Sequence, residues 1–164
     1  ISNLKIDNVH ASAQSTGADK SSVGILTGAT SGNITNIEIS NSSVSGGKYT
    51  GGVVGYAYGS IVGCKLTSCT VSGQYKAGGV VGFICSETKE GKDYKVNNNV
   101  LSAVTIEVNA ENLIQGKTAT IGKIVGHFNG SANTKGHCIG NTFTGTTKAT
   151  KNIGLITTVN VEEN

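Results

Sequence analysis

The stretch "YTGGVVGYAYGS", from Tyr49 to Ser60, decides the fold, because "KAGGVVGFICSE" repeats it from Lys76 onward. Gly51 and Gly78, which open the two glycine pairs, are 27 residues apart. Adjacent glycines are unfavourable in helices and strands, since each loses much backbone freedom on folding. A glycine pair that recurs at a fixed spacing therefore indicates a recurring place from which side chains are excluded.

The same spacing relates a second phrase, since "ITNIEISNSSVSG" aligns with "IVGCKLTSCTVSG". Weaker copies of this phrase are "ISNLKIDNVHAS", "VNNNVLSAVTIE" and "CIGNTFTGTTKA", and those of the glycine-rich phrase are "VGILTG", "IGKIVG" and "IGLITT". Five copies of one unit therefore fill residues 1–164, and repeats of this length are typical of stacked architectures. We expect a single domain that is a segment of a longer protein.

Aligned copies place like residues in columns two residues apart, which is the periodicity of a strand. An outward column of Lys5, Glu38 and Lys65 alternates in charge, as expected for neighbouring strands in register. One unit cannot bury its apolar residues alone, so the copies must stack as a solenoid of parallel strands, with about two or three short strands per coil. The apolar columns are Leu4, Ile37, Cys64, Asn99 and Asn141; Ile6, Ile39, Leu66, Leu101 and Phe143; Ala11, Val44, Val71 and Ile106; and Leu26, Val53, Val80, Ile124 and Ile156.

Glycines form two further columns beside the last apolar one. We interpret them as positions where the wall of the solenoid comes too close to the opposite side for any side chain. They are Gly24, Gly51, Gly78, Gly122 and Gly154, and Gly28, Gly55, Gly82 and Gly126.

The run "TGGVVGYAYGSIVGCKLTSCTVSG" resembles the GLUG repeat, in which a Gly-apolar-apolar-Gly strand precedes a strand that ends in Val-Ser-Gly. The resemblance covers the whole chain and is weakest in the fifth copy, where Thr158 replaces the last glycine. GLUG repeats occur in secreted and surface proteins of bacteria, including gut Bacteroides, adhesin-like proteins and the non-catalytic part of some immunoglobulin A peptidases. The resemblance implies an all-β fold, a right-handed parallel β-helix (β-solenoid) of about five coils with pectate-lyase-like architecture. It carries no catalytic residue.

Composition argues against several classes of function. All 13 basic residues are lysines, and without the arginine fork we expect no specific recognition of nucleic acid. No signal peptide and no apolar run of membrane length is present, so we expect no direct membrane insertion. Polysaccharide cleavage needs paired acids, but Asp7 and Glu38 lie on different columns. We therefore predict no enzyme activity, and no catalytic, cofactor-binding or metal-binding residue.

The four cysteines are interpreted as small buried residues, because Cys64 and Cys69 occupy columns that are otherwise apolar. A bridge between Cys64 and Cys69 stays open at this point.

Two groups of residues are candidates for binding a partner. If Val53 faces inward, then Val54, Val81, Val125, Tyr56, Phe83 and His127 face outward as an apolar and aromatic stripe, unless a bulge turns it inward or a neighbour covers it. The polar stretches "SETKEGKDYKVNNN" and "NTKGH" leave from one corner on successive coils, either as solvated insertions or as a contact surface. Their candidate residues are Lys89, Lys92, Asp93, Tyr94, Lys95, Lys135 and His137.

These features favour a structural and adhesive repeat module of a bacterial surface or secreted protein, extracellular or on the outer cell surface. The expected partners are a glycan or a host or bacterial surface protein, together with neighbouring domains of the same chain. The alternative is a catalytic or non-catalytic carbohydrate-active module, of lyase or hydrolase type, in a larger secreted enzyme.

Overall fold

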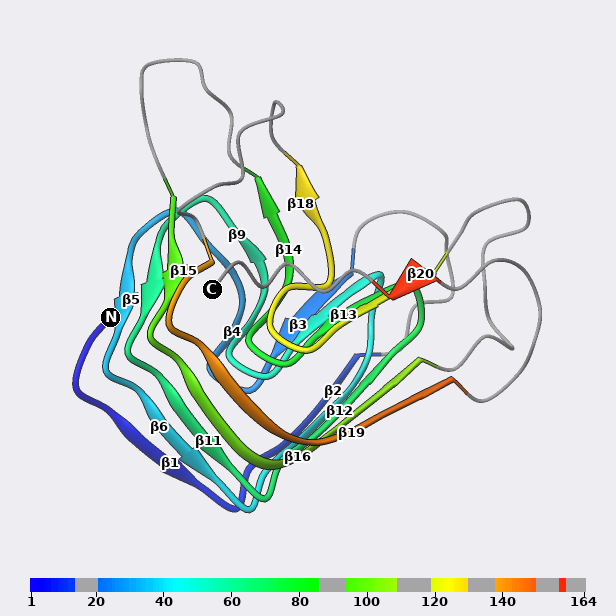
Figure 1. Ribbon diagram of the computed structural model, residues 1–164, viewed down its shortest axis with the longest axis horizontal. Helices are drawn as coiled ribbons and strands as arrows, with labels where there is room; N and C mark the ends of the chain where they lie inside the picture. The colour runs from blue at the N-terminus through cyan, green and yellow to red at the C-terminus, as the bar shows by residue number, and fades with distance from the viewer. Residues whose placement is uncertain (14–20, 86–93, 109–118, 130–137, 150–156, 159–164) are drawn as a thin grey trace.

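The computed structural model describes residues 1–13, 21–85, 94–108, 119–129, 138–149 and 157–158. Within these residues the chain is all-β, with parallel strands in curled sheets that form a half-barrel. Figure 1 shows successive passes of the chain lying over one another, with a two-armed outer sheet enclosing two further sheets. The prediction of an all-β, solenoid-like architecture is confirmed at this level.

The described strands form four sheets, named A to D in the order in which one pass visits them. Sheet A contains β5 (Ile34–Thr35), β10 (Ile61–Val62) and β15 (Val96–Asn97). Sheet B contains β1 (Lys5–Asp7), β2 (His10–Ala13), β6 (Glu38–Ser40), β7 (Ser43–Gly46), β11 (Lys65–Thr67), β12 (Thr70–Gly73), β16 (Val100–Val108) and β19 (Thr142–Ala149). Sheet C contains β3 (Ser22–Gly24), β8 (Tyr49–Gly51), β13 (Lys76–Gly78), β17 (Thr120–Gly122) and β20 (Thr157–Thr158). Sheet D contains β4 (Thr27–Thr30), β9 (Val54–Ala57), β14 (Val81–Cys85) and β18 (Phe128–Asn129).

The register of the strands confirms the repeat alignment. Lys5 and Lys65 both lie beside Glu38 on neighbouring strands, and the Lys5 ammonium is 2.9 Å from the Glu38 carboxylate. Gly51 pairs with Gly78 in sheet C, as the glycine columns require. One pass runs through five strands, β5 to β9, so the expectation of two or three strands per coil was wrong.

Left-handed corners divide each pass into these short strands. Ser68 and Ala103, for example, have φ values of 54° and occupy the same corner of sheet B on successive passes. A positive φ is unfavourable for a residue with a Cβ, and Asn and Gly tolerate it best. The two columns of corner residues are Asn3, Asn36, Gly63, Asn98 and Gly140, and Asn8, Asn41, Ser68 and Ala103.

We expect Ala103→Gly to stabilise the protein by about 1 kcal/mol, because glycine removes the steric cost of the left-handed conformation. Urea denaturation followed by circular dichroism measures the change. Thr67→Gly, at an exposed extended position of β11, is the matched control and should destabilise. A loss of stability in Ala103→Gly equal to that of the control would contradict the left-handed corner.

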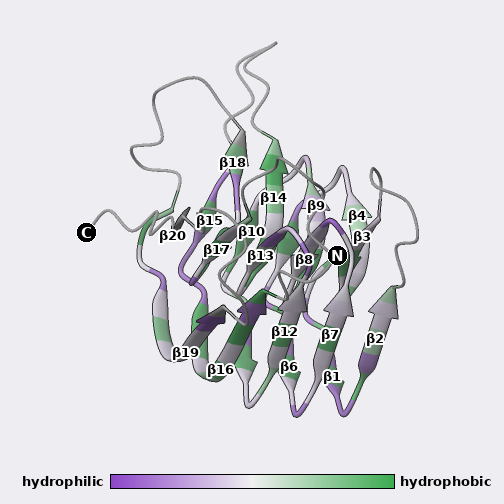
Figure 2. Ribbon diagram, turned by 90° about the vertical axis from the view of Figure 1, so that its right-hand side faces the viewer, coloured by the Kyte–Doolittle hydropathy of each residue, from purple (hydrophilic) through white to green (hydrophobic). Residues whose placement is uncertain are grey.

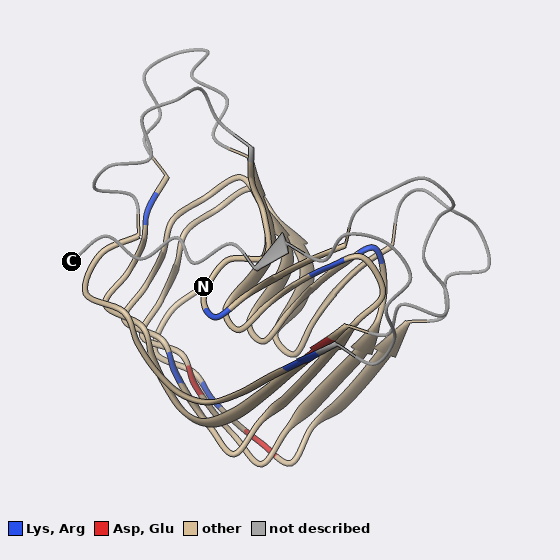
Figure 3. Cartoon of the chain, turned by 45° about the vertical axis from the view of Figure 1, so that its right-hand side comes forward, with Lys and Arg blue, Asp and Glu red and all other residues tan. Residues whose placement is uncertain are grey.

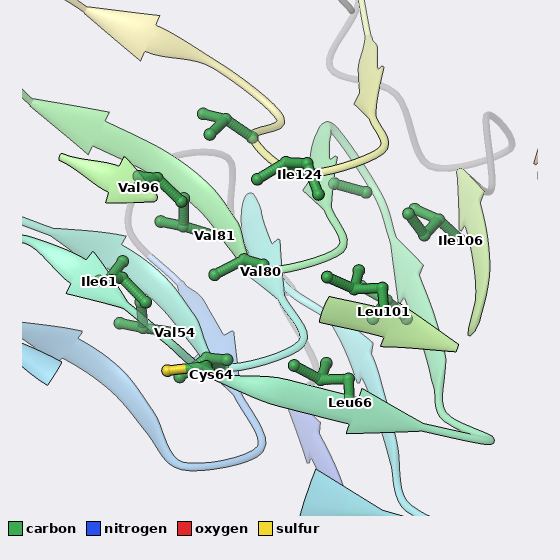
Figure 4. Close-up of a cluster of buried hydrophobic side chains, with 14 of the residues drawn as sticks. Val54, Ile61, Cys64, Leu66, Val80, Val81, Val96, Leu101, Ile106 and Ile124 are labelled. Carbon is green, nitrogen blue, oxygen red and sulfur yellow. The ribbon is translucent and has the colours of Figure 1, made fainter. Parts of the chain in front are cut away.

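The hydrophobic core takes side chains from all four sheets, including Val23, Ala77 and Ile121 of sheet C. Figure 4 shows Val54 near Ile61, and Val81 near Val96, on the core side of sheet D. Val54 and Val81 are fully buried, so the expected outward stripe is wrong for them and for the equally buried Val125. Figure 2 shows the hydrophobic character of β14, all of whose residues are buried.

The corner between β8 and β9, at Gly52 and Val53, causes this inward turn. The N–H groups of Val53 and Val54 both donate to the carbonyl of Val80, at 2.9 and 3.2 Å. Gly51 pairs with Gly78 before this corner and Val54 pairs with Val81 after it, so no residue is inserted and the chain bends without a β-bulge. The strict alternation of faces ends at this point, and both Val53 and Val54 are buried.

The glycine columns do exclude side chains, but the crowding comes from a different neighbour than predicted. A Cβ on Gly55 would lie 2.7 Å from the Tyr49 carbonyl and 2.8 Å from that of Gly28. The backbones of sheets C and D therefore meet directly behind the tight corner, and no opposite wall is involved. Glycine is needed because backbone atoms cannot yield.

The described cysteines, Cys64, Cys69, Cys85 and Cys138, are all buried, which confirms their interpretation as core residues. No bridge joins Cys64 to Cys69. Burial raises the pKa of both thiols, so they stay in the less reactive protonated form.

Candidate functional site

An aromatic cluster lies where sheets C and D face each other beyond the glycine corner. β9 supplies Tyr56 and β14 supplies Phe83, and the register of sheet D sets them side by side. His127 follows in the next pass, and Tyr49 reaches the cluster from the start of β8. The stacking of passes therefore places the aromatic residues of three successive repeats, Tyr56, Phe83 and His127, in one column.

The rings of the cluster are in close contact. Tyr56 and Phe83 are stacked, with centroids 4.9 Å apart and an interplanar angle of 9°. Phe83 and His127 are also stacked, at 5.1 Å. The ring of Tyr49 is tilted against Phe83 at 4.7 Å. Such contacts hold the rings in fixed positions on rigid strands, which lowers the entropy lost when a ligand binds to them.

Two tyrosine hydroxyls form the polar edge of the cluster. The hydroxyl groups of Tyr56 and Tyr58 are 3.0 Å apart, and their rings are in tilted contact. The side chain of Tyr58 is 41% exposed, and that of Tyr56 is half-buried. Burial, followed by the hydrogen bond with Tyr58, raises the pKa of the Tyr56 phenol. The two neutral hydroxyl groups can therefore both donate hydrogen bonds to a ligand and accept them from it at this edge.

Lysines pack against the same rings. The Lys76 ammonium is 5.6 Å from the centroid of Phe83 and 5.2 Å from that of Tyr75, and the Lys48 ammonium is 5.3 Å from that of Tyr49. These distances are in the range of cation–π attraction. Burial, and secondarily the charge of Lys76, lowers the pKa of His127 to about 4. The His127 ring is therefore uncharged at neutral pH and acts as an aromatic member of the column.

The structure brings together three of the residues predicted for the outward stripe, Tyr56, Phe83 and His127. Phe83 is only 8% exposed, so it packs against the other rings of the cluster and offers little surface to a ligand. Sequence reasoning missed Tyr49 and Tyr58, although three tyrosines in the quoted phrase "YTGGVVGYAYGS" were a visible signal. Their convergence depends on the sharp corner between sheets C and D.

The predicted loop residues are mostly outside the described part. Lys89, Lys92, Asp93, Lys135 and His137 lie outside the described residues. Of the remaining two, Tyr94 packs against the hydrophobic core and Lys95 is exposed. β14 and β18 end side by side, since Cys85 pairs with Asn129, so the two segments start from the same corner, as predicted.

The charged groups of the described residues are distributed unevenly. Their carboxylates are Asp7, Glu38 and Glu107, all of which belong to sheet B (Figure 3). Hydrogen bonds from Ser40 and Asn41 lower the pKa of Asp7, and Lys5 lowers that of Glu38. Within the described residues, no group of three or more His, Cys, Asp or Glu side chains is placed to hold a metal ion. The same part of the chain contains no helix long and apolar enough to cross a membrane.

Comparison with known proteins identified no relative of this chain. No family model, curated protein or solved structure matches the chain. The GLUG resemblance therefore stays a prediction from the residues quoted for it. The site is interpreted from its own geometry, a rigid aromatic cluster with a half-exposed tyrosine edge.

Proposed function

We propose that the chain is a structural and adhesive module that binds a glycan at the tyrosine edge of the aromatic cluster. The aromatic cluster carries this proposal. Sugar rings present apolar C–H faces and a rim of hydroxyl groups, and the side chains of Tyr56 and Tyr58 offer a complementary ring face and hydroxyl edge. Parallel strands fix these rings, so binding needs little ordering of the protein.

The wider setting of the module follows the repeat pattern. The in-register parallel strands and the recurring five-strand pass support a right-handed parallel β-helix of about five coils, with pectate-lyase-like architecture. The GLUG-like residues support a place in a secreted or surface-attached bacterial protein. In that setting the sheets act as a stiff support, and the aromatic cluster meets the partner.

Binding to a broad array of glycans and matrix proteins tests the proposal. We expect the wild-type chain to bind a glycan and Tyr58→Ala to weaken that binding at least about tenfold, as is usual for a tyrosine at the centre of a contact. Val100→Ala, which truncates a 37% exposed residue on sheet B, is the control and should bind like wild type. Melting curves establish that both variants are folded.

Four results would contradict the proposal. If the wild-type chain binds nothing on the array, the chain acts as a spacer instead of an adhesive module. Equal binding by Tyr58→Ala and wild type would exclude the tyrosine edge, and loss of binding only on shortening residues 88–95 would move the site to that loop. Binding to a matrix protein alone would replace the glycan by a protein partner.

A further inference from the structure

Lysine–tyrosine pairs open two neighbouring strands of sheet C, and the order within the pair reverses between them. Lys48 precedes Tyr49 on one pass, and Tyr75 precedes Lys76 on the next. The strand register sets Lys76 directly beside Tyr49, and the Lys76 N–H donates to the Lys48 carbonyl at 2.9 Å. Two lysines and two tyrosines therefore lie together at the same end of the sheet.

This end of sheet C adjoins the tyrosine edge of the aromatic cluster. β8 begins at Tyr49 and runs toward the corner at Gly52, and β9 runs away from that corner, as the equivalent β13 and β14 do in Figure 1. The rings of Tyr49 and Tyr56 meet across the two sheets, with centroids 5.5 Å apart. Lys48 precedes β8 and Tyr58 follows β9, so both lie beyond this ring pair, on the side away from the corner.

The charges of the described residues give this region a positive character. The Lys48 ammonium is 5.3 Å from the centroid of Tyr49, and the Lys76 ammonium is 5.6 Å from that of Phe83. The described strands of sheets C and D contain no Asp or Glu, whereas the described carboxylates all belong to sheet B (Figure 3). Fixed charges of one sign attract ligands of the opposite sign, so this region favours an anionic partner.

We propose that the glycan bound at the tyrosine edge is acidic and that the Lys48 ammonium contacts its carboxylate or sulfate group, an inference that rests on the proposed function. Lys48 is half-buried, and the flexible stem of a lysine lets its ammonium move from the ring of Tyr49 to a ligand. Lys76 is only 8% exposed, so it adds positive charge behind the rings without contacting the sugar.

The rings and the lysine act on different parts of such a ligand. The apolar face of a sugar packs against an aromatic ring, and its acidic group accepts charge-assisted hydrogen bonds from an ammonium. The rings of Tyr49 and Tyr56 also exclude water from one side of the contact, which strengthens the attraction between opposite charges. A neutral sugar makes only the first of these contacts, so the site discriminates between glycans by charge.

An array of glycans in matched pairs tests this preference without any variant. The members of each pair differ only in the acidic group, as do trigalacturonic acid and its methyl ester, or a sulfated galactose disaccharide and its unsulfated form. We expect the acidic member to bind at least about tenfold more tightly and its advantage to shrink at about 0.5 M salt, where exposed charges are screened. A preference confined to carboxylated or to sulfated sugars would identify the acidic group.

Substitution of Lys48 tests the contact itself. Lys48→Gln removes the charge and should weaken binding of the acidic member about tenfold, while binding of the neutral member stays unchanged. Lys48→Arg keeps the charge and should retain the preference. Lys65→Gln removes an exposed lysine from sheet B and should bind both members like wild type. Circular dichroism checks that the three variants are folded.

The outcomes separate this inference from the proposed function. Equal binding of acidic and neutral members that is lost in Tyr58→Ala would overturn the acidic preference and leave the glycan site in place. The absence of binding to any glycan would overturn both proposals. An acidic preference that persists in Lys48→Gln, or an equal loss for both members of a pair, would exclude a contact between Lys48 and the acidic group.

Discussion

Gly78→Val is expected to prevent folding. A Cβ at this position would lie 2.5 Å from Gly126 N and 3.0 Å from Ile124 O, and closer still to Val81 O. All three are backbone atoms of sheet D or its corner, so none can rotate away. We expect a cost above about 4 kcal/mol, at the far end of measured substitutions, against a typical total stability of about 5–15 kcal/mol.

Gly32→Val is the matched control for this prediction. A Cβ on Gly32 meets no atom within 4 Å, so the change in unfolding free energy should stay within about 0.5 kcal/mol. Thermal melting and urea denaturation of the two variants measure the contrast. Similar melting curves for Gly78→Val and wild type would contradict the backbone contact between sheets C and D.

The second large effect is expected for Asn99→Leu. Asn99 is fully buried; its Oδ1 accepts a bond from Cys64 N–H at 2.9 Å, and its Nδ2 donates to the Ile61 carbonyl at 3.2 Å. Leucine leaves both backbone groups without these partners in the core. Each buried group that loses its bond costs about 1–3 kcal/mol, so we expect a loss of about 3 kcal/mol.

Asn33→Leu separates burial from hydrogen bonding. Asn33 is exposed, and its Oδ1 accepts a bond from Ser60 N–H at 3.0 Å, the equivalent position of the next pass. Water can replace this bond, so the loss should be under about 1 kcal/mol. Equal losses in urea denaturation for the two variants would show that burial is not what makes Asn99 important.

Much of the fold was visible in the repeats. The alignment placed Ile39 beside Leu66 and Glu38 between two lysines, and the strand register agrees. These features depend only on spacing by two along a strand and on phrases that recur in each copy. Both are properties of the sequence itself, so they could be predicted.

The corner conformations were only partly visible. Asn36 and Asn98, at equivalent positions, are residues that tolerate positive φ, and this signal was overlooked. Ser68 and Ala103 adopt the same conformation without any preference of their own. Neighbouring passes impose it on them, because the stack requires a corner at that point.

The candidate site depended even more on the tertiary structure. The alternation rule placed Val54 and Tyr56 on one face, but Val54 is buried in the core and Tyr56 lies in the aromatic cluster. The corner at Gly52 and Val53 changes the direction of the chain between β8 and β9, and strand periodicity does not extend across a corner. No count along the sequence could reveal that change.

By itself the sequence determined that like residues stack in columns, that glycine recurs where no Cβ fits, and that Cys64 belongs to an apolar position. Those results follow from periodicity and from the need to bury apolar surface. Only the tertiary structure decided that Tyr49 and Tyr58 join Tyr56, and that the glycines let the backbones of sheets C and D meet. The reason is physical: these contacts are set by the angle of a corner, which arises from backbone packing between passes.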